Sequence, residues 1–227
     1  MTAKIIRAEK LSKHFSPGGQ HVQILKDVSI FVDAGEFVVV AGSSGSGKST
    51  LLSVLSGLDK PDGGSVELAG VDITPLSEDE LAPIRNELIG FVFQSFHLIP
   101  SLTAMENIQF PAELKKDKRA TEKARELLGK VGLSHRAGNY PSQMSGGEQQ
   151  RVAICRALIN EPKIVFADEP TGNLDSENSK GVIELLYDLH KELKTTLVIA
   201  THSHSLAERA GRVIRLYDGR IAEGRGM

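Results

Sequence analysis

The sequence predicts an α/β fold: a mainly parallel β-sheet with helices between its strands, an antiparallel β part near the N-terminus and an inserted helical part. Short apolar runs rich in β-branched residues alternate with segments whose apolar residues recur at helical spacing, an order typical of parallel sheets. Two segments near the N-terminus instead alternate apolar and polar residues, which predicts half-buried strands. Residues 95–161 read as helix almost throughout and interrupt the alternation. We therefore expect a single domain, with a core formed by 1–94 and 162–227 and a helical subdomain at 95–161.

Length and composition narrow the class of protein. The 227 residues can bury one large core, and 40% hydrophobic with 25% charged residues is ordinary for a soluble globular protein. A net charge of -2 shows no basic excess, so we expect no nucleic-acid partner. No apolar run approaches the roughly 18 residues of a membrane span, and the N-terminus lacks the apolar core of a signal peptide. Cys155 is the only cysteine, so no internal disulfide can form, and we expect it to be buried in a helix.

The first half of the chain predicts strands and helices in alternation. Strands are expected at KIIRAEKL and HVQILKDVSIFV, and a turn at DAGE leads into the buried strand FVVVAG. The helix KSTLLSVLSGL follows a glycine-rich loop and stops at DKPDGG. A short strand SVELAG, a helix near 77–88 and the strand IGFVFQ complete this half.

In the second half, the charged run KKDKRATEKARELLGK predicts an exposed amphipathic helix. After Pro162 we expect the buried strand KIVFADEP, a helix at about 176–193, the strand TLVIATH and a short helix. A closing hairpin RVIRLYDGRIAE turns on Asp218 and Gly219. Strands that alternate with helices in this way indicate a mainly parallel sheet.

The loop GSSGSGKST, residues 42–50, has the spacing of a phosphate-binding P-loop. Its backbone N–H groups can surround phosphates, the lysine can neutralise β- and γ-oxygens, the serine after it can bind Mg²⁺, and the threonine can reach the α-phosphate. A chance match somewhere in the chain has odds on the order of one in a hundred. Its residues are Gly42, Ser43, Ser44, Gly45, Ser46, Gly47, Lys48, Ser49 and Thr50.

Two adjacent carboxylates follow the apolar run of the strand IVFADE. A triphosphate site needs Mg²⁺, which prefers hard oxygen ligands near a strand end. We expect Asp168 to bind Mg²⁺, directly or through water. Because side chains alternate along a strand, Glu169 would point elsewhere and would orient and polarise the water that attacks the γ-phosphate.

Two further strand ends carry polar side chains. Gln94 ends IGFVFQ and could add an oxygen to the Mg²⁺ site or to the attacking water. His202 follows TLVIAT, where a donor could contact the γ-phosphate. A histidine at a strand end is also a common surface or capping residue.

A second glycine-rich turn opens the helix SGGEQQRVAICRAL, and we call its residues Ser145, Gly146 and Gly147 the signature turn. Ser145 and Glu148 have the spacing of a capping box, in which each side chain bonds a backbone N–H of the helix start. Capping does not account for two consecutive glycines, each of which costs about 1 kcal/mol of helix stability relative to alanine. Their missing side chains indicate close approach by another group, and a helix N-terminus suits an anion.

The motifs GSSGSGKST, MSGGE, IVFADEP, GNLD and ATH, together with Gln94, occur in the order and spacing of the nucleotide-binding subunits of ABC transporters. Over essentially its whole length the chain resembles this family, and GFVFQSFHLIPSLTAMENIQFP and ADEPTGNLDS are most similar to its lipoprotein-releasing and macrolide-exporting members. Cell-division and antimicrobial-peptide-resistance relatives are close to that subgroup. The resemblance implies a P-loop NTPase fold of the RecA-like kind.

The resemblance also implies a homodimer. In the family two copies pack head to tail, so that the signature turn of one covers the γ-phosphate held by the P-loop of the other. Asp175 of GNLD would then lie at the seam, and Phe15 would stack on the adenine where the family usually has tyrosine; plain strand packing of Phe15 is the alternative. The chain has Met144 and Glu148 where the common pattern LSGGQ has leucine and glutamine. Because glutamate repels phosphate, we assign Glu148 to the capping box.

The family receives its membrane subunit just after the glutamine strand. The segment there is unusually apolar for a loop, which suits the docking of a short helix from a permease. Core packing of the helical subdomain would account for about half of these side chains. The proposed docking residues are Phe96, Leu98, Ile99, Leu102 and Met105.

The resemblance therefore implies an ATPase that uses ATP and Mg²⁺, lies at the cytoplasmic face of the inner membrane and drives a separate permease in lipoprotein release or in macrolide- or peptide-type export. A mechanical ATPase of the cell-division kind, which signals across the membrane without transport, is one alternative. A non-transport ABC ATPase is another, although such proteins usually fuse two cassettes or carry a long coiled coil.

Overall fold

The structure, a computed structural model, describes residues 4–15 and 22–222. The chain divides into two compact units, one formed by 1–85 with 196–227 and the other by 86–195. Each unit has its own strands and helices.

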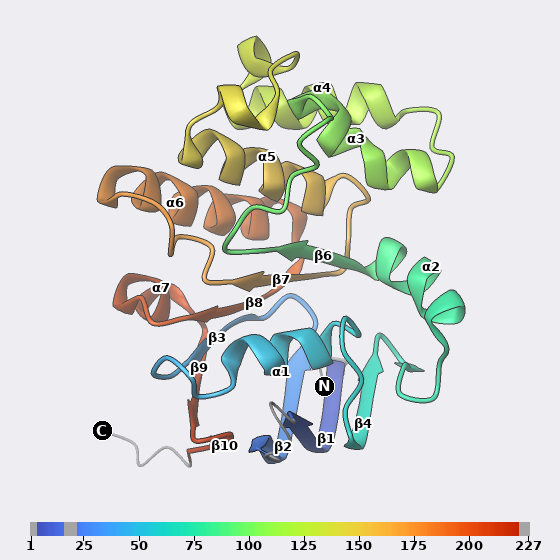
Figure 1. Cartoon of the computed structure of the whole chain (residues 1–227), viewed down its shortest axis with the longest axis vertical. Helices are drawn as coiled ribbons and strands as arrows, with labels where there is room; N and C mark the ends of the chain where they lie inside the picture. Colours follow the sequence, from blue (N-terminus) through green and yellow to red (C-terminus); the bar gives the residue numbers. More distant parts are fainter. Residues whose placement is uncertain (1–3, 16–21, 223–227) are drawn as a thin grey trace. The chain divides into compact units, whose positions relative to one another are not determined.

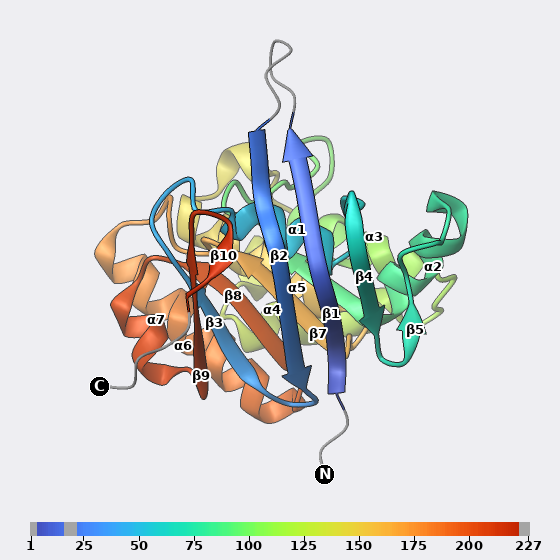
Figure 2. The same ribbon diagram turned by 90° about the horizontal axis from the view of Figure 1, so that it is seen from below.

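The first unit contains an antiparallel sheet with the order β2-β1-β4-β5 (Figure 2). Ile6 and Ala8 of β1 are fully buried at alternate positions, and Leu11 is fully buried after a register shift between Ala8 and Leu11, which leaves one face of the sheet apolar and the other solvated. The strands are β1 (Lys4–Phe15), β2 (Val22–Asp33), β4 (Gly63–Leu68) and β5 (Val71–Asp72).

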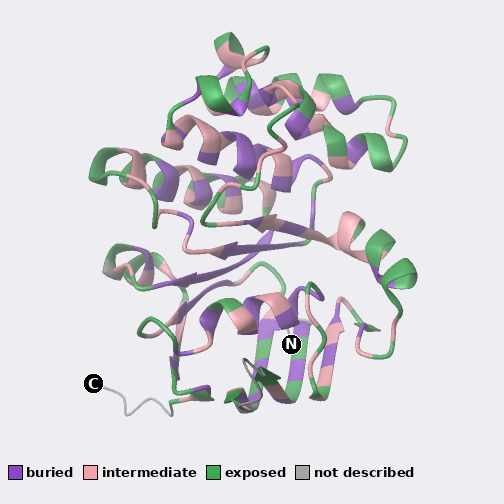
Figure 3. Cartoon of the chain, in the orientation of Figure 1, coloured by how far each residue is buried: buried purple, intermediate pink, exposed green. Residues whose placement is uncertain are grey.

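The same unit contains parallel strands in which β3 lies between β8 and β9. The strands β3 and β8 are almost wholly buried (Figure 3), which explains their continuous apolar sequences. The strands and helices of this part are β3 (Phe37–Ala41), α1 (Lys48–Leu55), β8 (Thr196–Thr201), α7 (His204–Arg209), β9 (Arg212–Tyr217) and β10 (Arg220–Ile221). The helix α2 (Glu78–Leu88) contains the boundary between the two units and leads into the first strand of the second unit.

The second unit places α5 against β6, α3, α4 and α6 (Figure 1). A cluster of buried side chains from α3, α4 and α5 forms its core, with Ile108, Leu128 and Val152 among the fully buried members. The elements are β6 (Ile89–Val92), α3 (Ala104–Leu114), α4 (Ala120–Lys130), η2 (Ser134–Arg136), η3 (Pro141–Gln143), α5 (Gly146–Leu158), β7 (Ile164–Asp168) and α6 (Ser176–Leu193). The strands β6 and β7 are parallel.

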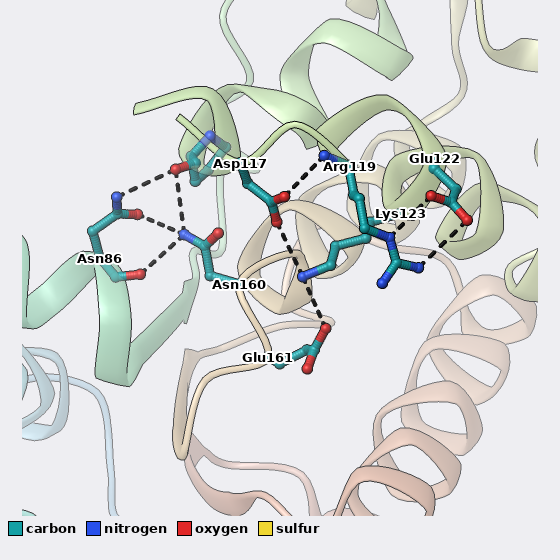
Figure 4. A network of polar contacts seen from close by, with 8 residues as sticks. Asn86, Asp117, Arg119, Glu122, Lys123, Asn160 and Glu161 are labelled. Carbon is teal, nitrogen blue, oxygen red and sulfur yellow. Dashed lines mark hydrogen bonds and ion pairs between the residues drawn. The ribbon is translucent and has the colours of Figure 1, made fainter. Parts of the chain in front are cut away.

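A polar network ties α4 to the chain just beyond α5 (Figure 4). The ammonium group of Lys123 lies 3.1 Å from Asp117 and 3.0 Å from Glu161. The pKa of Lys123 is raised mainly by its hydrogen bond to Glu161 and next by its hydrogen bond to Asp117. Next to Glu161, the side-chain amide of Asn160 donates to the side-chain oxygen of Asn86 over 2.7 Å. The network fixes the start of α4 relative to the strand β6 that follows Asn86.

The predicted fold class is confirmed: parallel strands, an antiparallel sheet and intervening helices are all present. The expectation of near-continuous helix over 95–161 is wrong in three places, because the chain turns between β6 and α3, between α3 and α4, and again between α4 and α5. Phe96 and His97 adopt left-handed backbone angles, with φ of 60° and 49°, which a helix excludes. Lys116 does the same with φ 57°, so the helix predicted from the charged run begins only at Ala120.

None of the helices in the described part of the chain is long and apolar enough to cross a membrane.

Candidate active site

The P-loop joins β3 to α1 in the first unit. Gly47 precedes the helix with φ 101°, a left-handed conformation that glycine adopts at little cost. No side chain caps the helix, and its first turn has no acidic residue. The backbone N–H groups of this turn therefore remain oriented toward the loop, as an anion site requires.

The interior of the P-loop is shaped for phosphate. A side chain at Gly42 would overlap the carbonyl oxygen of Leu216, so only glycine fits there. The ammonium group of Lys48 donates to the carbonyl oxygens of Gly42 and Ser43 over 3.0 and 3.1 Å and so lies across the loop. The hydroxyl oxygen of Ser46 is buried and has no hydrogen-bond partner within the described residues. A buried unpaired hydroxyl next to a fixed cation fits a site whose ligand is an anion.

His202 lies at the same edge of the sheet as the start of the P-loop. Thr201, the last residue of β8, pairs with Ala41, the last residue of β3. The parallel strands deliver the exposed His202 and the start of the P-loop side by side. Phe15 ends β1, in the same unit, with 55% of its surface exposed. An exposed aromatic ring of this kind offers a stacking face.

The two carboxylates lie in the second unit, at the end of β7. Asp168 is the last residue of the strand, and Glu169 follows it with φ 42°. The direction of the Glu169 side chain is therefore set by a left-handed turn, and the alternation of strand side chains that we expected to set it is not the cause. Such angles are costly for a non-glycine residue and cluster at functional sites. The turn is held by Gln150, whose buried amide donates 2.7 Å to the carbonyl oxygen of Pro170.

Gln94 lies next to the segment that follows Glu169. Its side-chain amide donates 3.3 Å to Asn173, and the amide of Asn173 returns 3.1 Å to the backbone oxygen of Gln94. A side chain at Gly172 would lie 2.7 Å from the Gln94 amide. Since β6 and β7 are parallel neighbours, the turn that carries Gln94, two residues after the end of β6, follows the strand next to the one that ends at Asp168. The predicted strand IGFVFQ therefore ends earlier than expected, at Val92.

The signature turn forms the predicted capping box. The hydroxyl of Ser145 accepts from the N–H of Glu148 over 3.3 Å, and the carboxylate of Glu148 accepts from the N–H of Ser145 over 2.7 Å. The second carboxylate oxygen of Glu148 lies 2.8 Å from the guanidinium nitrogen Nε of Arg136. The hydrogen bond from the Ser145 backbone is the main cause that lowers the pKa of Glu148.

The two glycines of the signature turn have different surroundings. A side chain at Gly147 would overlap the side-chain amide of Asn178, so packing against α6 favours glycine there. A side chain at Gly146 would meet only ordinary contacts, Leu174 at 3.4 Å and Phe96 at 3.6 Å. Packing within the chain therefore does not explain the absence of a side chain at Gly146.

Asp175 caps α6. Its carboxylate accepts from the backbone N–H groups of Glu177 and Asn178 over 3.0 and 2.9 Å. These bonds lower the pKa of Asp175, and the bond from the Asn178 backbone has the largest effect. The predicted seam residue is thus a rigidly held helix cap.

The five predicted docking residues are all half-buried, and two of them, Leu98 and Met105, pack against the core of the helical unit. Their loop is held by two residues that no sequence motif singles out. The first, Arg156 of α5, donates to the carbonyl oxygens of Phe96 and His97.

The second of these residues, Asn107, is fully buried on α3. Its side chain accepts from the N–H of Ile99 over 2.7 Å and donates to the carbonyl oxygens of Ile99, Leu102 and Thr103. Asn107 lies among the buried positions Ala104, Ile108 and Ala112. A polar residue on an apolar helix face is the signal that could have identified it.

Several of the predicted site residues carry oxygen donors of the kind that bind Mg²⁺. Among the described residues no group of three or more histidine, cysteine or acidic side chains is arranged to hold a metal ion. Mg²⁺ typically takes one or two protein ligands and completes its shell with phosphate oxygens and water. Ser49 in the first unit has a hydroxyl oxygen, and Gln94 and Asp168 in the second unit have an amide and a carboxylate oxygen; each of these is a hard donor of the kind that Mg²⁺ prefers.

Comparison with known proteins shows the family. Residues 25–172 match the family model described as ABC transporter. The chain is 45% identical over its whole length to the lipoprotein-releasing system ATP-binding protein LolD of Idiomarina loihiensis, of which it covers 100%. It is 47% identical to LolD of Geobacter metallireducens over 96% of its own length and 98% of that protein. The macrolide export ATP-binding/permease protein MacB of Burkholderia pseudomallei is 45% identical over 99% of this chain, which spans 35% of that protein.

Two solved structures are closely similar. A dimeric ATP-binding cassette, MJ0796, in a post-hydrolysis state bound to ADP and Pi, superimposes with a TM-score of 0.89 at 40% identity, over 98% of this chain and 100% of that one. A second dimeric structure of MJ0796, described as a bacterial ABC transporter cassette, gives the same TM-score and coverage at 41% identity. This chain belongs to the ABC transporter family and is an ATP-binding cassette with ATPase activity, most similar to the cassettes of lipoprotein-releasing and macrolide-export systems.

Proposed function

We propose that two copies of this chain close head to tail on ATP and thereby drive a separate permease at the cytoplasmic face of the inner membrane, in lipoprotein release or in macrolide- or peptide-type export. The observation that carries the proposal is the backbone of Gly146. Its own chain leaves room for a side chain there, so the need for glycine is explained by a ligand that approaches from outside the chain. The dimeric state of the cassette MJ0796 supports the formation of a dimer.

In this proposal the P-loop binds the phosphates of ATP, and Lys48 moves its ammonium group from the loop carbonyls to the β- and γ-oxygens. Ser49, Asp168 and Gln94 would hold Mg²⁺, which when bound neutralises charge on the phosphate oxygens. Glu169 accepts a proton from the attacking water, and His202 donates a hydrogen bond to the γ-phosphate. Both residues directly follow strands, which hold their backbones in place.

The remaining site residues complete the shared site. Phe15 stacks on the adenine, and the signature turn of the second copy contacts the γ-phosphate from the opposite side. Asp175 lies at the seam. When the γ-phosphate leaves, the contacts across the seam are lost and the two copies part.

Substitution of Glu169 tests the catalytic role. Glu169→Gln is expected to abolish turnover, leave ATP binding intact and stabilise the ATP-bound dimer, because the amide cannot accept the proton of water. Steady-state phosphate release, nucleotide binding and light scattering with ATP measure the three properties. A variant that hydrolyses ATP at the wild-type rate would refute the assignment.

Substitution of Gly146 tests the shared site. Gly146→Asp adds bulk and negative charge to the signature turn, so the ATP-dependent dimer should be lost while the monomer still binds nucleotide. Gly146→Ala is the milder variant: the chain accommodates its methyl group, so its melting temperature should stay close to that of the wild type while dimerisation weakens. Dimerisation of Gly146→Asp at wild-type ATP concentrations would contradict the proposal.

The permease is proposed to dock beside the loop between β6 and α3, at Phe96, Leu98, Ile99, Leu102 and Met105. Purification from membranes of the organism of origin, with Ile99→Asp as the comparison, tests this. We expect the wild type to retain a lipoprotein-releasing or export permease and the variant to lose it. A partner of the cell-division type would instead favour signalling without transport.

A further inference from the structure

The glutamate of the signature turn creates an electrostatic problem for the proposed function. Glu148 occupies the position where the common LSGGQ pattern has an uncharged glutamine. Its pKa is lowered, chiefly by the hydrogen bond from the Ser145 backbone, so the carboxylate is charged at neutral pH. The same helix tip is proposed to receive the γ-phosphate of a second copy. A negative charge within one helical turn of a phosphate repels it.

Arg136 lies where it can cancel this charge. It belongs to η2, outside the helix that carries Glu148, and its Nε donates 2.8 Å to the Glu148 carboxylate. The side chain of Glu148 is only 13% exposed, and that of Arg136 is 36% exposed. At this burial the ion pair is screened less by solvent than an open surface pair.

The capping box alone does not need an arginine, as a second box in this chain shows. On α3, Thr103 and Glu106 form the same reciprocal hydrogen bonds. The pKa of Glu106 is lowered only by hydrogen bonds from Thr103, against the opposing effect of burial. Arg136 is therefore an addition specific to the signature turn.

We propose that Arg136 is a positioning residue of the nucleotide site: it neutralises and orients Glu148 so that the signature turn can accept the γ-phosphate bound to a second copy of the chain. The inference rests on the proposed function, since without a shared site there is no phosphate to repel. It extends that function to a residue outside the recognised motifs.

A double-substitution cycle in the full chain tests the inference. The quantity measured is the ATP concentration at which half of the protein is dimeric, by light scattering, in a Glu169→Gln background that holds the dimer. Arg136→Met is expected to raise that concentration about tenfold, because the unpaired Glu148 then faces the phosphate. Arg136→Lys keeps the positive charge and should stay within about threefold of the starting protein.

Rescue distinguishes a charge effect from a packing effect. Adding Glu148→Gln to Arg136→Met is expected to restore dimerisation, because glutamine completes a capping box without charge. Arg119→Met removes an exposed ion pair with Glu122 on α4 and serves as the matched control, with no change expected. Binding of a fluorescent ATP analogue to the monomer should be equal in all variants.

Three outcomes would overturn the inference. Arg136→Met could dimerise at the ATP concentration of the starting protein, or the double variant could remain as impaired as Arg136→Met alone, or Arg136→Lys could be as impaired as Arg136→Met. Each would show that neutralisation of Glu148 does not matter. If the Glu169→Gln protein itself fails to dimerise with ATP, the proposed function fails and the inference fails with it.

Discussion

The buried side-chain amide of Gln150 donates a 2.7 Å hydrogen bond to the carbonyl oxygen of Pro170. The bond joins α5 to the turn that begins at Glu169, whose backbone is held in a left-handed conformation. A strained angle persists only where its surroundings fix it. The helix that starts with the signature turn thus also holds the carboxylate that is proposed to act on water.

Gln150→Leu should lower kcat for ATP hydrolysis by roughly 10- to 100-fold, because small displacements of a catalytic group have large effects. The KM for ATP should change little, since the P-loop belongs to other strands. The unpaired carbonyl oxygen should also cost about 1 to 3 kcal/mol of stability. Steady-state kinetics and urea unfolding measure both quantities.

Asn160→Leu is the control for this loss of stability, because Asn160 makes part-buried hydrogen bonds to Asn86 and Pro111 away from the catalytic turn. Its kcat should match the wild type. Equal losses of kcat in the two variants would argue against a specific role for Gln150.

Gly90→Ala should destabilise the protein by about 1 to 3 kcal/mol, because the new methyl group would overlap the carbonyl oxygen of Ala157 and push β6 away from α5. Gly181 lies on an exposed face of α6, and a methyl group there would meet no atom within 4 Å beyond its chain neighbours and the adjoining helix backbone, so Gly181→Ala should instead stabilise by about 0.5 to 1 kcal/mol. Urea unfolding of both variants gives the two signs. If Gly90→Ala left the free energy of unfolding unchanged, β6 and α5 would be able to move apart without loss of stability.

The capping carboxylates predict a pH dependence of stability. The pKa of Glu106 is lowered from its ordinary 4.5 by hydrogen bonds from Thr103. Its contribution is therefore complete above pH 4.5 and is lost as the pH falls through the lower value of the folded state. The stability of the wild type relative to Glu106→Gln should decline between about pH 5 and pH 3. Unfolding free energies that run parallel in the two proteins would exclude this linkage.

Burial raises the pKa of the Cys155 thiol to about 12. The reactive thiolate is therefore nearly absent at pH 8. We expect no labelling by a maleimide in the native protein over an hour and complete labelling in urea, as measured by mass spectrometry. Rapid native labelling would mean that the core of the helical unit opens often.

Much of the fold follows from short-range patterns. Uninterrupted apolar runs identified β3, β7 and β8, and helical spacing identified α1 and α6 within a few residues. The breaks in the helical unit were missed because left-handed residues such as Phe96 and Lys116 are not glycine and carry no local signal. Tertiary contacts decide those angles.

The site was predictable only as far as its motifs extend. The P-loop and the capping box of the signature turn depend on neighbours within a few residues, so their spacing is visible in the sequence. The partners Arg136, Gln150 and Asn107 were not found, because each acts on a segment brought to it by folding. Gln150 did leave a trace, as a polar residue on the helix face shared with the buried Gly147 and Ile154.

The helix α5 is long enough to connect the signature turn mechanically to the loop between β6 and α3. Thirteen residues at 1.5 Å each make a rod of about 20 Å, with the signature turn at one tip and Arg156 near the other, where it holds the carbonyl oxygens of Phe96 and His97. A tilt of α5 by about 5° about its signature-turn end would shift its Arg156 end by nearly 2 Å, which is enough to break a hydrogen bond. Closure on a nucleotide would thus be transmitted mechanically to the proposed permease loop, and a kink introduced midway along this rod should leave binding intact while the two ends no longer move in step.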